Sequence, residues 1–300
     1  MQPGEPPGPS LDDDRLRELE AVARDLAAAA GREIVNALAR GIHVEYKSEP
    51  RTAGDAPTDP VSEVDHAVEA LIRSRLRERF PGHAVIGEEA DEHPSAADEF
   101  AWAVDPVDGT TNFVNRFPLF AASIGVLYRG QPVAGAIWCS TSHALDRGVY
   151  HARLGGALSF DGAPVETAPA NTGVRRALAA APGGAPGRTA AWDNRVTGSA
   201  ALECAFVAAG IFTSARFWSP HIWDVAAGIV LLRAAGRDAL VASRSGWTPF
   251  ERFEPPSRLR EDREPTLRDW VRPMLIGSPE ALEALRRRPA FPWWRRLLRL

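Results

Sequence analysis

Acidic residues stand beside short apolar stretches at several places in the chain. Glu88 and Glu89 end one apolar stretch, Asp105 and Asp108 end the next, and Asp224 begins a stretch of helical character. Sites in α/β proteins are usually built at strand ends, and carboxylates brought together repel one another unless a cation neutralises them. Because Mg²⁺ prefers oxygen ligands, these acids predict a divalent-metal site.

The segment Asp105–Asn112 reads Asp-Pro-Val-Asp-Gly-Thr-Thr-Asn. Its proline fixes a turn in which both aspartates and the carbonyl of Val107 can point to one place. Gly109 allows the backbone to come close to an anion, and Thr110 and Thr111 begin a predicted helical turn whose free amides suit a phosphate. A single acid at a strand end is most often a turn former or a helix cap, but that interpretation does not explain the whole segment.

Alternating helical and strand patterns must position these acids, and they indicate a mixed α and β fold. The sequence Arg-Gly-Gln-Pro at 129–132 predicts a hairpin turn. The expected helices span 11–39, 61–80, 199–210, 223–235 and 279–288, the expected strands span 84–87, 100–104, 121–128 and 133–139, and loops are expected over 49–60, 171–188 (with a weak strand as the alternative) and 245–266.

The composition is that of an ordinary globular protein with 300 residues and a formal net charge of −4, which gives no case for nucleic-acid binding. Two cysteines, Cys139 and Cys204, are too few for a disulfide framework and are expected to be buried in a reducing compartment. No stretch is long and apolar enough to span a membrane, so we expect no stable membrane insertion and a cytoplasmic location. The Pro- and Gly-rich residues 1–10 are expected to be a disordered leader.

Several motifs together resemble the inositol monophosphatase family, part of the magnesium-dependent, lithium-sensitive phosphatase superfamily. The resemblance runs from about Leu11 to Leu285, and the order and spacing of the motifs match. The motifs are Gly-Glu-Glu at 87–89, Trp-Ala-Val-Asp-Pro-Val-Asp-Gly-Thr-Thr-Asn-Phe at 102–113, Arg-Phe-Pro at 116–118 and Trp-Asp-Val-Ala-Ala-Gly at 223–228, with Lys47 and 59–65 as N-terminal matches.

This resemblance implies a layered αβαβα sandwich of the inositol monophosphatase and fructose-1,6-bisphosphatase type, a homodimer, two or three Mg²⁺ ions per site and inhibition by lithium. The implied metal ligands are Glu88, Asp105, the carbonyl of Val107, Asp108 and Asp224. Glu88 and Thr110 would position the attacking water, with Asp108 as a further catalytic residue. Lys47, Asp59, Asp65 and Glu89 would surround a weaker third metal, and Gly109, Thr110, Thr111, Ser199 and Ala200 would contact phosphate or substrate.

The substrate is less clearly indicated, because Phe217 stands where the inositol enzymes have a glutamate that grips ring hydroxyls. A phenylalanine cannot accept a hydroxyl hydrogen bond, which penalises a polyol. Phe217 and Trp218 could stack on a base or an imidazole, and Arg216 could pair with a second anion. Equally, both aromatic residues could be core or dimer-contact residues.

The leading hypothesis is a Mg²⁺-dependent phosphomonoesterase for inositol 1-phosphate or a similar polyol phosphate. The alternatives are a phosphatase for histidinol phosphate or 3′-phosphoadenosine 5′-phosphate, and, in another class, a non-catalytic regulatory binding protein on the same fold. The expected organisation is an N-terminal half over 11–155 with most metal ligands, a C-terminal half over 156–290 with the last ligand and the substrate loop, and a basic amphipathic tail over 291–300.

Overall fold

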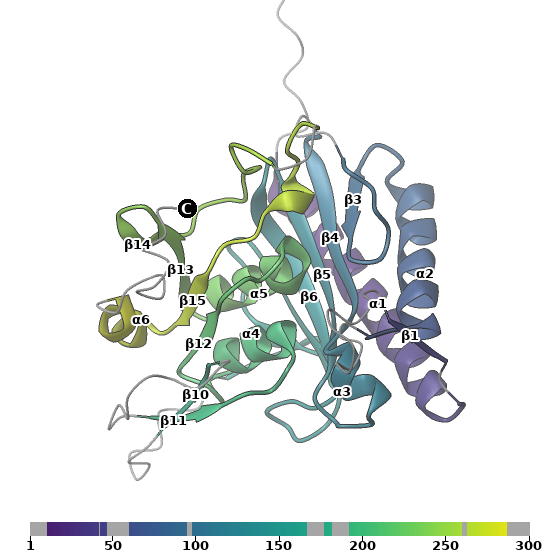
Figure 1. The fold of residues 1–300 in the computed structure, drawn as a ribbon, viewed down its shortest axis with the longest axis horizontal. Helices are drawn as coiled ribbons and strands as arrows, with labels where there is room; N and C mark the ends of the chain where they lie inside the picture. The colour runs from purple at the N-terminus through teal and green to yellow at the C-terminus, as the bar shows by residue number, and fades with distance from the viewer. Residues whose placement is uncertain are drawn as a thin grey trace, which may run out of the picture.

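Two β-sheets alternate with layers of helices in the order helix, sheet, helix, sheet, helix (Figure 1). The predicted layered αβαβα arrangement is therefore confirmed. The leader and tail expected at 1–10 and 291–300 lie outside the described residues. The structure, a computed structural model, describes residues 11–41, 43–46, 60–94, 98–166, 177–181, 192–259 and 263–286.

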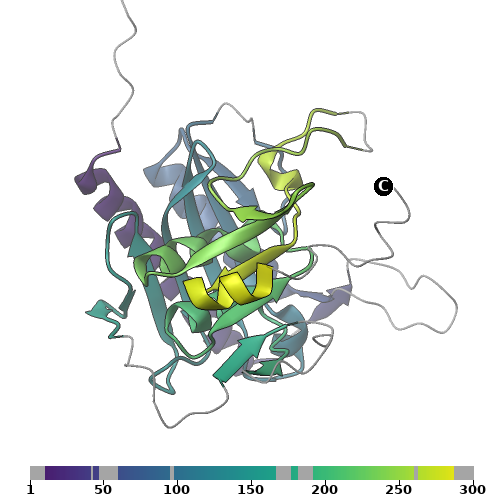
Figure 2. The same cartoon turned by 90° about the vertical axis from the view of Figure 1, so that its left-hand side faces the viewer.

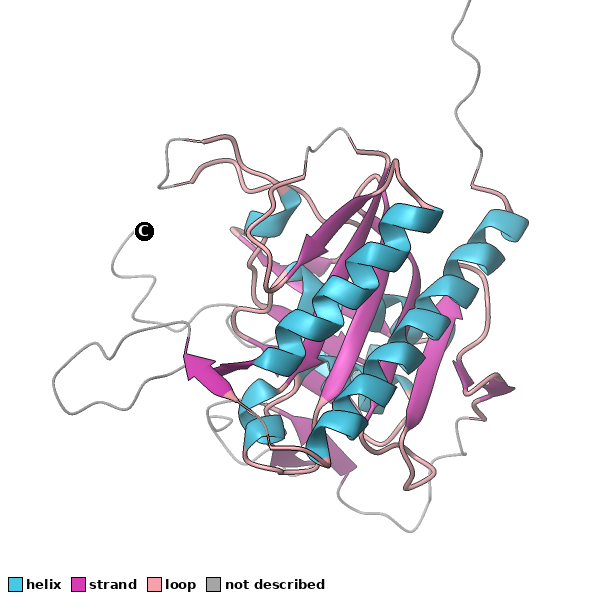
Figure 3. Ribbon diagram, turned by 90° about the vertical axis from the view of Figure 1, so that its right-hand side faces the viewer, coloured by secondary structure: helices cyan, strands magenta, loops and turns pink. Residues whose placement is uncertain are grey.

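The outer helices α1 (Asp13–Leu38) and α2 (Glu63–Arg79) lie side by side over one face of the first sheet (Figure 3). The side chain of Asp12 accepts a hydrogen bond from the backbone amide of Arg15 at 2.8 Å and so caps α1. Ser62 and Asp65 form a capping box at the start of α2. Both helices begin within two residues of the predicted positions, because apolar spacing and caps are local signals.

The first sheet holds strands in sequence order, antiparallel except for the parallel pair β3 and β4. The predicted hairpin between β5 and β6 is confirmed, since Arg129 and Gly130 have φ values of 49° and 79° as its two turn residues. The strands are β3 (Ala84–Gly87), β4 (Phe100–Asp108), β5 (Ala121–Tyr128), β6 (Gln131–Cys139), β7 (Gly148–Arg153), β8 (Ser159–Phe160) and β9 (Ala163–Pro164), beside a separate ladder of β1 (Val44–Tyr46) and β2 (Pro60–Ser62).

One predicted boundary in this sheet is wrong in a way that matters for the site. Strand β4 does not end at Val104 but continues through Asp105 to Asp108. Its pairing with β5 shifts register between the two aspartates, which accommodates the proline between them. Both acids therefore belong to a buried strand with a local irregularity, and the turn begins only at Gly109.

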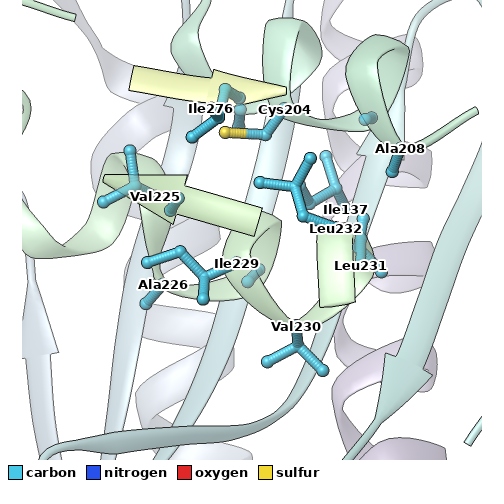
Figure 4. Packing of buried hydrophobic residues seen from close by; sticks show 14 of the residues in the cluster. Ile137, Cys204, Ala208, Val225, Ala226, Ile229, Val230, Leu231, Leu232 and Ile276 are labelled. Carbon is cyan, nitrogen blue, oxygen red and sulfur yellow. The ribbon is translucent and has the colours of Figure 1, made fainter. Parts of the chain in front are cut away.

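Helices α4 (Ala200–Ala208) and α5 (Ile222–Ala234) fill the layer between the sheets, where residues of both pack with Ile137 and Ile276 (Figure 4). Both helices are apolar on nearly every side, as expected of buried helices. The second sheet has strand order β11-β10-β12-β15-β13-β14, with α6 (Pro279–Arg286) on its outer face (Figure 2). Its strands are β10 (Ala177–Ala180), β11 (Trp192–Arg195), β12 (Ser214–Phe217), β13 (Asp238–Ser243), β14 (Gly246–Pro249) and β15 (Met274–Gly277).

Two glycines of the first sheet allow α5 to lie close to it. Gly125 of β5 and Gly135 of β6 are paired in register. A Cβ atom added at Gly135 would lie 2.7 Å from Cα of Ala227 and 2.9 Å from its carbonyl oxygen, and one added at Gly125 would lie 2.7 Å from Cβ of Ala226. The glycines thus set how closely α5, which begins with Ile222, Trp223 and Asp224, approaches the strands that hold the other acids.

His83 packs between two phenylalanines at the edge of the first sheet. Its surroundings indicate that the stability of the protein depends on pH. Its ring stacks on Phe80 and Phe100 at centroid distances of 4.7 and 4.6 Å. Its Nδ1 accepts a hydrogen bond from the indole of Trp102 at 3.0 Å, and its Nε2 lies 3.2 Å from a guanidinium nitrogen of Arg15. Burial, then the Arg15 charge, lowers the pKa of His83 from 6.5 to about 4.

The unfolded chain therefore takes up a proton at His83 near pH 6.5 while the folded protein does not, so the free energy of unfolding should fall as pH drops from 7 towards 4. For a half-buried ring we expect a loss of about 1–2 kcal/mol. Urea unfolding across this pH range measures it. In His83→Gln, which does not titrate, this part of the slope should vanish. An unchanged slope in the variant would assign the effect to other groups.

In the part of the chain that the structure describes, no helix is long and apolar enough to cross a membrane. The two cysteines are buried and unpaired, as predicted. The first sheet ends at Pro164 and the second begins at Ala177 in the chain. The division into halves near residue 155 stays a prediction.

Candidate active site

One pocket of about 180 Å³ collects most of the predicted site residues. They come from the end of β3, the end of β4, the start of the short helix α3 (Thr110–Val114) and the start of α5. Segments far apart in the sequence thus meet at one end of the first sheet. The pocket is lined by Glu88, Asp105, Val107, Asp108, Gly109, Thr110, Thr111 and Asp224.

Asp105 lies at the centre of the electrostatics of this pocket. Its side chain is 2% exposed, and its Oδ1 is buried without a hydrogen-bond partner. Burial raises the pKa of Asp105 well above its usual range, and the charges of Glu88, Asp108 and Asp224 raise it further. A buried carboxylate oxygen that faces other carboxylates is stabilised by a bound cation, so these residues fit a hard divalent ion.

The acids line the pocket without forming a closed cage. Among the described residues, no three acidic, histidine or cysteine side chains are gathered as a complete metal site. Mg²⁺ does not require such a cage, because it keeps several waters and binds through one or two carboxylates together with substrate phosphate. Val107 also lines the pocket, and its carbonyl is an oxygen of the kind that such ions accept.

Asp108 is held by the first turn of α4, which comes from the second half of the chain. The hydroxyl of Ser199 donates to it at 2.5 Å, and the amides of Ala201 and Ala200 donate at 2.6 and 3.2 Å. Burial raises the pKa of Asp108 to about 6, although these hydrogen bonds lower it. Ser199 and Ala200 thus orient Asp108 and lie outside the pocket lining, and their contact with substrate stays a prediction.

Asp224 stands in the first turn of α5. Its Oδ2 accepts the backbone amide of His221 at 2.7 Å, which completes the cap of the helix. Burial and the charge of Asp108 raise the pKa of Asp224 well above its usual range. The hydroxyl of Ser123 on β5 donates to the carbonyl of Trp223 at 3.0 Å, so the start of α5 is tied to the first sheet.

Thr110 joins the pocket to the second helix. Its Oγ1 lies 2.9 Å from the carbonyl oxygen of Val107 and 3.0 Å from Oδ1 of Asp65. Asp65 is fully buried and also accepts hydrogen bonds from the amide and hydroxyl of Ser62. Asp65 therefore orients Thr110 and caps α2, outside the pocket lining, and its place beside a weaker third metal stays a prediction. Gly109 precedes α3 with φ of 91°, a conformation that favours glycine.

The remaining predicted residues divide into two groups. Lys47 and Asp59 lie outside the described residues. Glu89 is outside the pocket lining, with an oxygen 3.9 Å from Nδ1 of His66. Phe217 is 4% exposed and packs in the hydrophobic core from strand β12, so the structure favours its interpretation as a core aromatic.

A supporting residue that sequence reasoning missed is Glu69, which is 2% exposed on α2. Its carboxylate accepts the amides of Glu89 and Ala90 at 2.8 and 3.0 Å, and Arg73 pairs with it at 2.7 Å. It thereby fixes the loop that carries Glu88. The available signal was a charged residue within the apolar face of the predicted helix, one position after Val68.

The contact between Ser199 and Asp108 gives a direct test of how α4 supports the site. In Ser199→Ala we expect activity to fall about 10-fold because Asp108 loses its shortest hydrogen bond. We also expect the free energy of unfolding to fall by about 1 kcal/mol, since Ser199 caps α4. Phosphate release and urea unfolding measure both effects.

Ser278→Ala is the matched control, because the Ser278 hydroxyl accepts the amide of Ala281 at 3.3 Å in the first turn of α6, on the outer face of the second sheet. This control should lose similar stability and keep its activity. Equal activity in the two variants would contradict the role given to Ser199.

Comparison with known proteins agrees with this geometry. Residues 15–258 match the model of the inositol monophosphatase family. Phosphatase IMPL1 of Arabidopsis thaliana, a chloroplastic protein, is 30% identical over 232 residues, which cover 71% of this chain and 59% of that protein. Inositol monophosphatase 2 of Rattus norvegicus is 33% identical over 245 residues, or 75% of this chain and 79% of that protein. Nus factor SuhB of Salmonella typhimurium is 33% identical over 220 residues, or 70% and 82%.

Solved structures with a similar fold include proteins of the same kind. A crystal structure of an IMPase/NADP phosphatase with Mg²⁺ and phosphate superimposes with a TM-score of 0.68 at 17% identity, over 91% of this chain and 95% of that one. That likeness establishes the fold, while the family match rests on the sequence. The chain belongs to the inositol monophosphatase family, a family of phosphoric monoester hydrolases.

Proposed function

We propose that this protein hydrolyses a small phosphate monoester with the help of Mg²⁺. The observation that carries the proposal is the partnerless buried oxygen of Asp105, set in a pocket with Glu88, Asp108 and Asp224. A purely structural pocket has no physical reason to be lined by carboxylates that repel one another. The Mg²⁺ and phosphate in the related IMPase/NADP phosphatase structure support the same choice of ion.

In this proposal Glu88, Asp105, Asp108, Asp224 and the carbonyl of Val107 hold two or three Mg²⁺ ions. When bound, the ions supply a water that ionises near neutral pH and positive charge for the phosphate and the departing oxygen. The weaker third ion would also need residues around Lys47, Asp59, Asp65 and Glu89.

The chain itself contributes the geometry of the attack. Asp65 and the Val107 carbonyl hold the Thr110 hydroxyl hydrogen, which leaves the oxygen free to accept a hydrogen bond from water. Glu88 would accept the proton of that water. Water oxygen then bonds to phosphorus, the bond to the alcohol oxygen breaks, and that oxygen takes up a proton. Backbone amides of Gly109, Thr110 and Thr111 hold the phosphate.

A polyol phosphate such as inositol 1-phosphate is the first substrate to test, as the family relationship suggests. Histidinol phosphate and 3′-phosphoadenosine 5′-phosphate remain alternatives, because the glutamate that grips ring hydroxyls in inositol enzymes is replaced by the buried Phe217. The Arg216 guanidinium lies over the ring of Trp218 at 3.9 Å. This face of the Trp218 ring is therefore covered by Arg216 and does not offer a surface for a substrate base. A homodimer, lithium inhibition and a cytoplasmic location belong to the same proposal.

A second candidate function is regulatory binding, since one relative at 33% identity is a Nus factor. The proposed metal ligands and Thr110 are all present and all line the pocket, which favours the enzyme over a scaffold without activity. The two functions are not exclusive. The variant Asp108→Asn distinguishes the two functions, because it should stop phosphate hydrolysis and leave binding of a partner protein unchanged.

The test of the main proposal is phosphate release from a panel of phosphomonoesters with and without Mg²⁺. The panel holds inositol 1-phosphate, histidinol phosphate, 3′-phosphoadenosine 5′-phosphate and fructose 1,6-bisphosphate. Mg²⁺-dependent release from one of them is the expected result. If the folded, Mg²⁺-loaded protein released no phosphate from any of them, the proposal would have to give way to the regulatory function.

A further inference from the structure

A segment from the second half of the chain reaches across to the loop that carries Glu88. This segment, residues 263–271, lies before β15 and contains the short 3-10 helix η1 (Leu267–Asp269) (Figure 1). Asp269 shapes it internally, because its carboxylate accepts the Thr266 amide at 2.8 Å and pairs with Arg263 at 2.5 and 2.8 Å. These contacts hold the turn together from within.

Arg268, the middle residue of this turn, contacts the backbone that carries Glu88 and the residue that precedes Asp224. Its guanidinium donates to the carbonyl oxygen of Gly87 and, at 3.1 Å, to that of Glu88. The same guanidinium lies 5.0 Å from the ring centre of Trp223, the residue before Asp224. Its side chain is 13% exposed.

Further contacts tie Trp223 back to the segment that carries Arg268. The Trp223 ring is also stacked on His221 at 4.6 Å and nearly parallel to it. His221 in turn forms an isolated β-bridge with Val271, at the end of the segment. Arginine presents its donors in a planar fork, which suits two neighbouring carbonyls on one side and an aromatic face on another.

We propose that Arg268 is a positioning residue that sets the distance between Glu88 and Asp224 and so the affinity of the site for its metal. The inference rests on the proposed metal-dependent function. Glu88 is carried by a loop after β3 and Asp224 by the first turn of α5, and Arg268 is anchored to both segments at once. Removing Arg268 keeps both carboxylates in the protein but no longer fixes the distance between them, which weakens metal binding.

The charge of Arg268 predicts the opposite effect and must be separated from its geometry. A positive charge near a metal site repels the ion, so its removal alone would tighten binding. Part of that charge is offset by Asp91, whose carboxylate lies 3.5 Å from Nε of Arg268. The two explanations therefore differ in the sign of the change in metal affinity.

The test measures Mn²⁺ binding to the full-length protein from the electron paramagnetic resonance signal of free Mn²⁺. We expect the Mn²⁺ dissociation constant to rise about 10-fold in Arg268→Met and about 3-fold in Arg268→Lys, which keeps a donor and the charge. Arg233→Met is the matched control, because Arg233 also donates to a backbone carbonyl, that of Phe250 at 2.5 Å, and lies over its ring at 5.8 Å, at the other end of α5.

The control should bind Mn²⁺ like the unmodified protein. Equal or tighter Mn²⁺ binding by Arg268→Met, in a protein that still binds Mn²⁺ and releases phosphate when unmodified, overturns the positioning role and leaves the proposed function intact. If Arg268→Met does not fold, Arg268→Lys decides in the same way. Absence of Mn²⁺ binding in the unmodified protein overturns the proposed function and this inference together.

Discussion

Replacing Asp105 by asparagine should stabilise the metal-free protein and at the same time remove its phosphatase activity. Asp105 has a buried oxygen without a partner and stands among other carboxylates. Asparagine keeps the shape and removes the charge, so the free energy of unfolding without metal should rise by about 1–3 kcal/mol. Activity should fall by at least about 100-fold, because an amide is a poor substitute for an anionic ligand.

Three measurements on Asp105→Asn check this expectation. Urea unfolding in a chelator gives the stability of the metal-free form, phosphate release gives the activity, and a Mg²⁺ titration of the melting temperature gives the linkage between binding and stability. Mg²⁺ should raise the melting temperature of the unmodified protein and have little effect on the variant. Asp146→Asn, which removes an exposed carboxylate, should change none of the three. A less stable, fully active variant would refute the assignment of Asp105 as a ligand.

Gly135→Ala should destabilise the protein by about 1–3 kcal/mol and also reduce its activity. The added methyl group would lie 2.7 and 2.9 Å from backbone atoms of Ala227, so α5 must move away from the first sheet. Asp224, a proposed metal ligand, is carried by that helix, and a displacement of about 1 Å in an active site can reduce the rate by about 100-fold. Urea unfolding and phosphate release measure the two effects.

Two controls separate a backbone clash from a general effect of alanine. Gly82→Ala adds a methyl group where nothing lies within 4 Å, so its stability and activity should stay unchanged. In the double variant Gly135→Ala, Ala227→Gly the loss should persist, because the atoms that meet the new methyl group belong mainly to the backbone. Full recovery in the double variant would show that the side chain of Ala227 is responsible instead.

The parts of the fold that sequence predicts well are those with local causes. The apolar spacing of the sequence placed α1 and α2, and the turn at Arg129 and Gly130 placed the hairpin, whereas the caps at Asp12 and Ser62 are seen only in the structure. The end of β4 at Asp108 could not be placed, because a proline normally ends a strand and only the register shift against β5 permits Pro106 within β4.

In the candidate site, too, the sequence predicts the features with local causes and misses those that depend on distant contacts. The pocket lining at Glu88, Asp105, Asp108 and Asp224 follows from motifs in the sequence. The supporting contacts do not, since the hydrogen bonds from Ser199 to Asp108 and from Arg268 to Glu88 span 91 and 180 residues. Motifs report the groups that do chemistry, whereas the groups that hold them are chosen by tertiary packing.

The strand orders of the two sheets have a consequence for how the protein folds. The first sheet joins neighbours in sequence, whereas the second joins β12 to β15 and β15 to β13, so its contacts close much longer loops. Local pairings form early and long-range ones late, so we expect the first sheet and its outer helices to be protected from hydrogen exchange before α5 docks. Such an intermediate would carry Glu88, Asp105 and Asp108 without Asp224. Tight metal binding would therefore report that folding is complete, and a newly made chain would not sequester Mg²⁺ before its second half had docked.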